Sequence, residues 1–160
     1  MELYFRDNVF NSGTTAIMNA NQDQVGEVDL RSTFGSSLEV FDGAGGSLYS
    51  GGFPFFSGKW TITGADGAER GRLRGRMSFL SKKFEYEAYG RGIFDIEAGA
   101  FSSEYEIRDG QGQLAATFEK VSGWFSSSAY RLSCEMTAVD AFEWVAVILG
   151  LNEIQKRQRS

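Results

Sequence analysis

The chain has 160 residues, 42% of them hydrophobic and 14% aromatic, with 20 glycines and one proline. This length and composition exclude a disordered or collagen-like chain and predict a single domain over residues 1–160. The chain has no histidine, which excludes Ser-His and Cys-His nucleophile pairs and imidazole metal sites. The formal charge of −5 opposes general attraction to phosphate backbones, so nucleic acid is not an expected partner.

Short alternations of apolar and polar residues begin at Leu3 and continue to Cys134. This period of two, bounded by Gly, Asn and Asp clusters, predicts β-strands over about residues 2–134. Each strand has one apolar and one polar face, which favours antiparallel pairing with the polar face in solvent. The clearest examples are Ser37–Phe41, Lys83–Tyr89, Ser103–Arg108, Gln113–Glu119 and Ala129–Cys134.

Turn sequences that tolerate positive φ recur along this part of the chain at intervals of roughly 22 residues, which indicates a repeated hairpin. They occupy residues 19–24, 42–46, 64–67, 90–92 and 109–112. Five hairpins, together with a first strand over 2–6 and a last one over 129–134, give about twelve strands. A sheet of that size has two exposed edges unless it closes, so we expect a closed barrel.

The last segment predicts an α-helix over about residues 138–157, apolar on nearly every face. Thr137 and Asp140 form a capping-box-like start, and Lys156, Arg157 and Arg159 suit the negative end of the helix dipole. The apolar run is shorter than the roughly 20 residues that a membrane span requires, so a transmembrane helix is the less favoured alternative. A barrel of about twelve strands has a lumen too wide for its own side chains to fill. We therefore predict an all-β fold, a closed antiparallel barrel around a central hydrophobic C-terminal helix.

Several of these segments resemble the LURP-one-related proteins, which belong with the tubby C-terminal domain and the phospholipid scramblases in a tubby-like superfamily. The resemblance lies in the helical segment from Thr137 to Ile154 and in hairpins such as Val40–Leu48 and Ile107–Leu114. It implies a twelve-stranded barrel around a hydrophobic helix, and in the tubby branch a basic pocket that binds phosphoinositides. No binding residue of those families is carried over to a position in this chain.

A row of basic residues is the strongest candidate site. Arg70, Arg72, Arg74 and Arg76 are two residues apart, which predicts that they project from one strand face, and Lys82 and Lys83 extend the row. Guanidinium groups in such a row suit phosphates or a phospholipid head group. The favoured alternative is cross-strand pairing with the carboxylates of neighbouring strands, which would neutralise the row. Those carboxylates belong to Glu85, Glu87, Asp95, Glu97, Glu104 and Glu106.

Other candidate chemistry is weaker. Pairs such as Glu85 and Glu87 are spaced for one strand face in solvent rather than for acid-base catalysis. The segment Gly51–Ser57 is expected to fold over one mouth of the barrel, with an exposed contact patch as the alternative. The single cysteine, Cys134, cannot close an intramolecular disulfide and is interpreted as a buried, unreactive thiol. The start of the chain shows no signal-peptide pattern, and with the lone cysteine this predicts a cytoplasmic protein.

We expect no enzymatic activity, cofactor or metal. The predicted function is that of a scaffold or protein-interaction module whose partner is another protein or a second copy of the chain. The alternative is a binder of anionic ligands or of phospholipid head groups at a membrane surface through the basic strand face.

Overall fold

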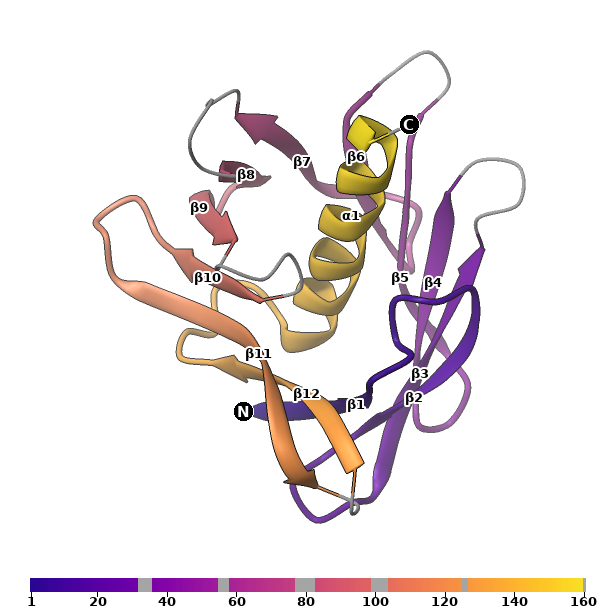
Figure 1. Cartoon of the computed structure of the whole chain (residues 1–160). Coiled ribbons are helices and arrows are strands. Elements are labelled where there is room, and N and C mark those ends of the chain that lie inside the picture. Colours follow the sequence, from indigo (N-terminus) through magenta and orange to yellow (C-terminus); the bar gives the residue numbers. More distant parts are fainter. Residues whose placement is uncertain (32–35, 55–57, 77–82, 99–103, 125–126, 160) are drawn as a thin grey trace.

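The computed structural model describes residues 1–31, 36–54, 58–76, 83–98, 104–124 and 127–159, with backbone alone at 76, 127, 158 and 159. It contains twelve strands and one helix (Figure 1). In chain order these are β1 (Glu2–Arg6), β2 (Gly13–Met18), β3 (Gln24–Arg31), β4 (Ser37–Asp42), β5 (Ser47–Gly52), β6 (Trp60–Gly64), β7 (Glu69–Arg76), β8 (Lys83–Ala88), β9 (Gly92–Ala98), β10 (Tyr105–Arg108), β11 (Leu114–Trp124), β12 (Ser127–Cys134) and α1 (Ala141–Arg159).

The strands form one closed antiparallel barrel in which each strand pairs with its neighbour in sequence. The first and last strands close it, with Leu3 opposite Leu132 and Phe5 opposite Tyr130. The predicted closed barrel of about twelve strands is therefore confirmed. Closure pairs the backbone groups that an open sheet would leave at its two edges.

Three of the hairpin turns share one local structure. Asn19, Asp42 and Asp109 each accept backbone N–H bonds from the residues two and four positions later. Gly45 and Gly112 follow Asp42 and Asp109 with φ near +87° and +81°, a conformation that suits glycine. The repeated Asn/Asp and Gly positions thus fix the turns at one end of the barrel, as the sequence spacing indicated.

Helix α1 runs through the barrel, as predicted (Figure 1). It begins at Ala141, three residues later than expected, and the Asp140 carbonyl accepts the N–H of Trp144 at 3.0 Å. Asp140 rather than Thr137 therefore precedes the first helical residue. Its carboxylate accepts the Tyr49 hydroxyl at 3.1 Å, so a strand side chain holds the start of the helix. No helix in the described part of the chain is long and apolar enough to cross a membrane.

The core forms where inward strand side chains meet the helix. Trp144 lies edge-on to Phe94 and tilted against Tyr86, with ring centroids 5.2 and 5.6 Å apart. Trp60 on β6 donates its indole N–H to the Ala146 carbonyl at 3.1 Å. A Cβ added at Gly150 would lie 2.3 Å from Trp60 Nε1, so the helix approaches the wall this closely only because Gly150 has no side chain. The helix and the barrel therefore bury one shared core.

Candidate functional site

The basic row predicted on β7 is paired with acids. Arg74 donates to Glu85 on β8, with Nη2 2.6 Å from Oε1, and these hydrogen bonds raise the pKa of the guanidinium. Arg72 forms an ion pair with Glu69 on its own strand, with Nε 3.5 Å from Oε2. The pairing of Arg74 with Glu85 is the cross-strand neutralisation that the sequence favoured.

Arg70 does not share a face with Arg72 and Arg74, so the prediction of four aligned arginines is wrong at this position. The β6–β7 register passes from Ile62 opposite Gly71 to Thr63 opposite Glu69, which leaves Arg70 as an extra residue in a β-bulge. A Cβ added at the inward-facing Gly64 would lie 2.6 Å from Arg70 Nε, so the arginine packs on the inner side at the mouth of the barrel. There it pairs with Asp66 at 3.1 Å.

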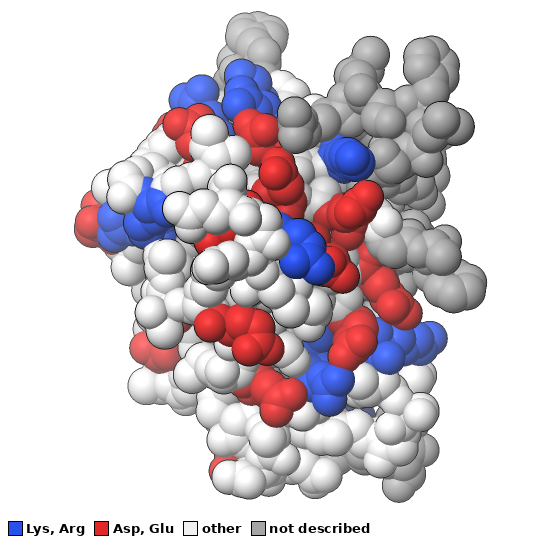
Figure 2. All heavy atoms as spheres, turned by 90° about the vertical axis from the view of Figure 1, so that its left-hand side faces the viewer, with Lys and Arg blue, Asp and Glu red and all other residues white. Residues whose placement is uncertain are grey.

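The remaining members of the predicted row are only partly described. The side chain of Arg76 and the whole of Lys82 lie outside the described residues. Lys83 is exposed at the start of β8, opposite Arg76 on one side and Glu97 on the other. Figure 2 shows acidic and basic side chains interleaved on the side of the barrel that it displays, rather than gathered by sign. Arg72 and Arg74 therefore belong to a charge-paired outer surface.

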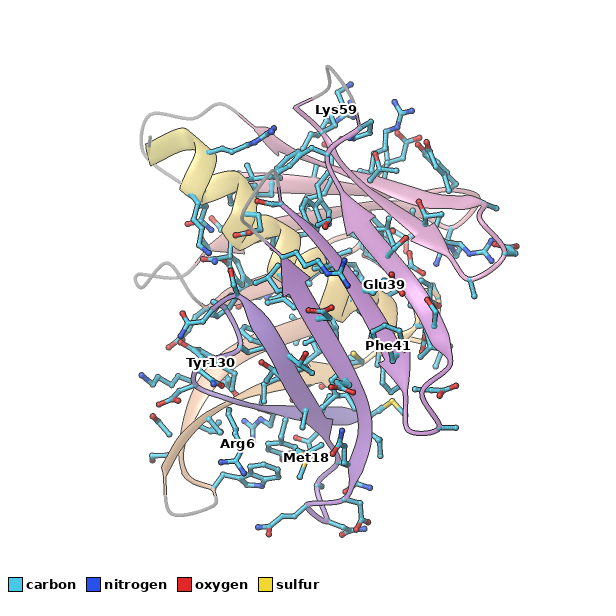
Figure 3. The ribbon with its side chains drawn as sticks, turned by 90° about the vertical axis from the view of Figure 1, so that its right-hand side faces the viewer. Arg6, Met18, Glu39, Phe41, Lys59 and Tyr130 are labelled. Atoms are coloured by element: carbon cyan, nitrogen blue, oxygen red, sulfur yellow. The ribbon has the colours of Figure 1, made fainter. Side chains whose placement is uncertain are left out.

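A hollow of about 440 Å³ lies on another part of the outer wall, over β3 to β7. Figure 3 turns much of this wall toward the viewer and labels Glu39 on β4. The strand register places the outward residues of this wall in two ladders that cross the five strands. The acidic ladder is Asp29, Glu39, Ser50, Thr63 and Glu69, and the second ladder is Arg31, Ser37, Gly52, Thr61 and Arg72. We call this hollow the groove.

Small residues make the floor of the groove and larger ones its sides. Ser50, Gly52 and Thr61 lie at the centre, where two neighbouring strands carry little side-chain volume. Asp29 and Glu39 stand at one end and Glu69 at the other, while Phe53 adds an apolar side. The groove is therefore a consequence of small residues placed between charged ones on adjacent strands.

The polar groups of the groove differ in how well the protein itself satisfies them. Thr61 is only 8% exposed, and its Oγ1 has no hydrogen-bond partner. Asp29 and Glu39 face each other directly across β3 and β4, an arrangement that places like charges together. Arg31 lies 3.1 Å from Asp29, and Glu39 accepts the Ser47 hydroxyl at 3.3 Å. The groove thus has an unused hydroxyl in its floor and two adjacent carboxylates at one end.

A buried polar network lies inside the barrel at the start of the helix. Glu143 is 1% exposed, and both of its oxygens accept from Arg91, at 2.7 and 3.0 Å. Tyr86 donates its hydroxyl to the same carboxylate. Arg91 also donates to the Arg70 carbonyl at 2.9 Å. Hydrogen bonding to Glu143 raises the pKa of the Arg91 guanidinium. The pKa of the Tyr86 hydroxyl is raised mainly by burial and secondly by the charge of Glu143.

Sequence reasoning missed this network because the segment Gly90-Arg91-Gly92 was interpreted only as a turn. The turn is present, and Gly90 and Gly92 both have positive φ. The available signal was Glu143, an acid inside the apolar run Ala141–Leu151, since a buried carboxylate requires a partner.

The other end of the helix has a second buried acid with fewer contacts. Glu153 is also 1% exposed, and neither of its oxygens has a hydrogen bond, although Lys156 Nζ lies 3.0 Å from Oε2 as an ion pair. Nearby, Gln155 donates to the Tyr105 hydroxyl at 2.7 Å. The Arg157 guanidinium lies over the ring of Phe53, with Cζ 3.7 Å from the ring centroid. Phe53 therefore packs against the end of the helix, as expected for the segment Gly51–Ser57, of which residues 55–57 lie outside the described residues.

The remaining candidates show no reactive arrangement. Burial raises the pKa of the Cys134 thiol to about 11, which disfavours the nucleophilic thiolate. Glu85 is engaged by Arg74. Among the described residues, no group of three or more acidic or cysteine side chains is placed to hold a metal ion.

The fold has a counterpart among solved structures. The X-ray structure of the Arabidopsis thaliana protein AT5G01750 matches 96% of this chain and 90% of its own, with a TM-score of 0.59 and 12% sequence identity. A likeness at this identity shows a shared fold and nothing more. No protein-family model matches the chain, and no curated protein matches it significantly.

Proposed function

We propose that the protein is a non-enzymatic interaction module of the tubby-like superfamily, in which a plugged barrel presents the groove to a partner protein. The superfamily assignment is supported by the barrel-and-helix architecture and by the fold shared with AT5G01750. The choice of a protein partner rests on one observation, the groove of about 440 Å³ on the outer wall with the unsatisfied hydroxyl of Thr61 in its floor. Buried polar groups are normally hydrogen-bonded, so a partner group is the natural complement of this hydroxyl.

The structure gives less support to an anionic ligand on the β7 surface. The described arginines there are each within 4.0 Å of a carboxylate, with Arg74 on Glu85, Arg72 on Glu69 and Arg70 on Asp66. A phosphate would have to displace these acids, and only two of the three arginines point outward together. We therefore place the phospholipid head group second and test it separately below.

Position-specific cross-linking tests the proposed function. A photoreactive residue at Ser50, in the groove floor, is compared with one at Glu106 on the outer face of β10. We expect a discrete protein adduct from position 50 alone in extracts of the source cells. The adduct should disappear from a protein that also carries Thr63→Trp, which fills the groove while leaving the melting temperature intact. Identical adducts from both positions would refute a dedicated groove partner, and sedimentation shows whether an adduct is a second copy of the chain.

A further inference from the structure

We propose that the groove holds an extended segment of the partner that carries two basic side chains four residues apart. This inference rests on the proposed interaction function and specifies the partner's chemistry. It is carried by the spacing of the acids, by the charge of the groove and by the unpartnered Thr61.

The spacing follows from the register of the strands. The acidic ladder crosses from β3 to β7, and strands lie about 4.8 Å apart, so it spans about 19 Å. An extended chain advances about 3.3 Å per residue, so about six residues cover this length. Glu39 on β4 and Glu69 on β7 are three strand spacings apart, or about 14 Å, which corresponds to four residues of such a chain. Side chains four residues apart in an extended segment point to the same side and can reach both acids.

The charges of the groove select a basic segment. Its lining contains three carboxylates, of Asp29, Glu39 and Glu69, and one guanidinium, of Arg31. Arg31 already donates two hydrogen bonds to Asp29 in the free protein, whereas Glu39, directly opposite Asp29, accepts only the Ser47 hydroxyl among the described contacts, so Glu39 is the acid that a basic side chain engages. At the other end Glu69 lies 3.5 Å from Arg72 Nε and accepts the Tyr89 hydroxyl at 3.0 Å. Both contacts are at the exposed surface, so a second basic side chain can join them.

The floor of the groove suits a backbone lying between the two ladders. Thr61 Oγ1 is buried without a partner, and a hydroxyl can donate to a carbonyl or accept from an N–H of a bound segment. Ser50 and Gly52 beside it leave room for a main chain to approach.

Four labelled peptides of nine residues test the inference by fluorescence anisotropy. The first carries arginine at its third and seventh positions in a Gly/Ser/Thr background, the second carries glutamine there, and the third carries glutamate. The fourth carries arginines three residues apart. We expect the first to bind most tightly and to weaken between about 50 mM and about 300 mM salt, because ions screen exposed charges. Amide resonances of Ser50, Gly52 and Thr61 should shift on binding.

Matched variants of the protein show which residues the bound peptide contacts. Glu39→Gln should weaken the first peptide about three- to tenfold, the range for loss of an exposed charge pair in a groove. Glu106→Gln makes the same change on β10 and should leave binding unchanged. Thr61→Val should weaken binding without lowering the melting temperature, because its hydroxyl has no partner to lose. A purely structural role for Thr61 would not change peptide affinity.

The outcomes separate this inference from the proposed function. Equal binding of the arginine and glutamine peptides, or resonance shifts outside the groove, would overturn the basic segment. If the protein adduct from position 50 is lost with Thr63→Trp yet retained with Glu39→Gln, the interaction function stands and the basic segment is wrong. If the two variants both leave the adduct intact, both proposals fail.

Discussion

Glu143 and Glu153 lie on the same helix, ten residues apart, and both are almost completely buried. Glu143 is held by two hydrogen bonds from Arg91 and one from Tyr86, whereas Glu153 has an ion pair with Lys156 and no hydrogen bond. The partners of Glu143 come from the barrel wall, while Lys156 belongs to the helix itself. Equal burial therefore does not imply an equal role. The network at Glu143 fixes the helix to the wall, and the contact at Glu153 is local to the helix.

Removing Arg91 should produce the largest effect. In Arg91→Ala the Glu143 carboxylate loses its bidentate partner inside the barrel, and breaking a buried pair in this way costs about 3 kcal/mol. Chemical denaturation measures the free energy of unfolding. The double variant Arg91→Met with Glu143→Leu removes both charges and should recover much of the loss, and a double variant no more stable than Arg91→Ala would contradict this account.

Alkaline pH should weaken the same end of the molecule. The pKa values of Tyr86 and Tyr49 are raised, chiefly by burial, and both hydroxyls also face carboxylates. Below about pH 10 the folded and unfolded chains hold these protons equally. Above it the unfolded chain loses them first, so the free energy of unfolding falls, by up to about 1.4 kcal/mol per pH unit for Tyr86. Thermal melts from about pH 8 to about pH 11 should show this slope, and Tyr86→Phe should reduce it.

The outer wall provides an intermediate case of charge pairing in solvent. Arg72→Glu with Arg74→Glu places acids opposite Glu87 and Glu85, and like charges across strands destabilise a sheet. We expect a modest fall in melting temperature, smaller than that of Arg91→Ala. The unaltered protein should not bind vesicles of anionic phospholipid, because its described arginines are already paired. Vesicle binding that weakens with salt and disappears in this double variant would instead establish the head-group function.

Changes at the other end of the helix should have the smallest effects. Lys156→Ala removes the half-exposed cation beside the buried Glu153 and a hydrogen bond to the Phe10 carbonyl, and should lower the free energy of unfolding by about 1–2 kcal/mol, less than Arg91→Ala. Glu153→Met replaces a buried carboxylate that has no hydrogen bond with an apolar side chain, and should be neutral or stabilising. A loss comparable to that of Arg91→Ala at either position, measured by the same denaturation, would remove the distinction between the two ends.

The architecture could be predicted from the amino-acid sequence. Period-two alternation, recurring Asn/Asp and Gly turns and one wholly apolar helix predict the barrel, the number of its strands and the buried helix. These signals are local, since side-chain period and turn chemistry act over a few residues. The pairing of Arg74 with Glu85 could also be anticipated, because alternation places both on the polar face of their strands.

The contacts between residues across the barrel could not be predicted in the same way. The bulge beside Thr63 moved Arg70 off the row, and a bulge is a property of two paired strands rather than of one segment. Arg91 meets Glu143 across 52 residues of sequence. The groove arises because small residues on β5 and β6 fall between acids on β3, β4 and β7. Each of these contacts depends on the register between strands and on the position of the helix, which no single segment of the chain encodes.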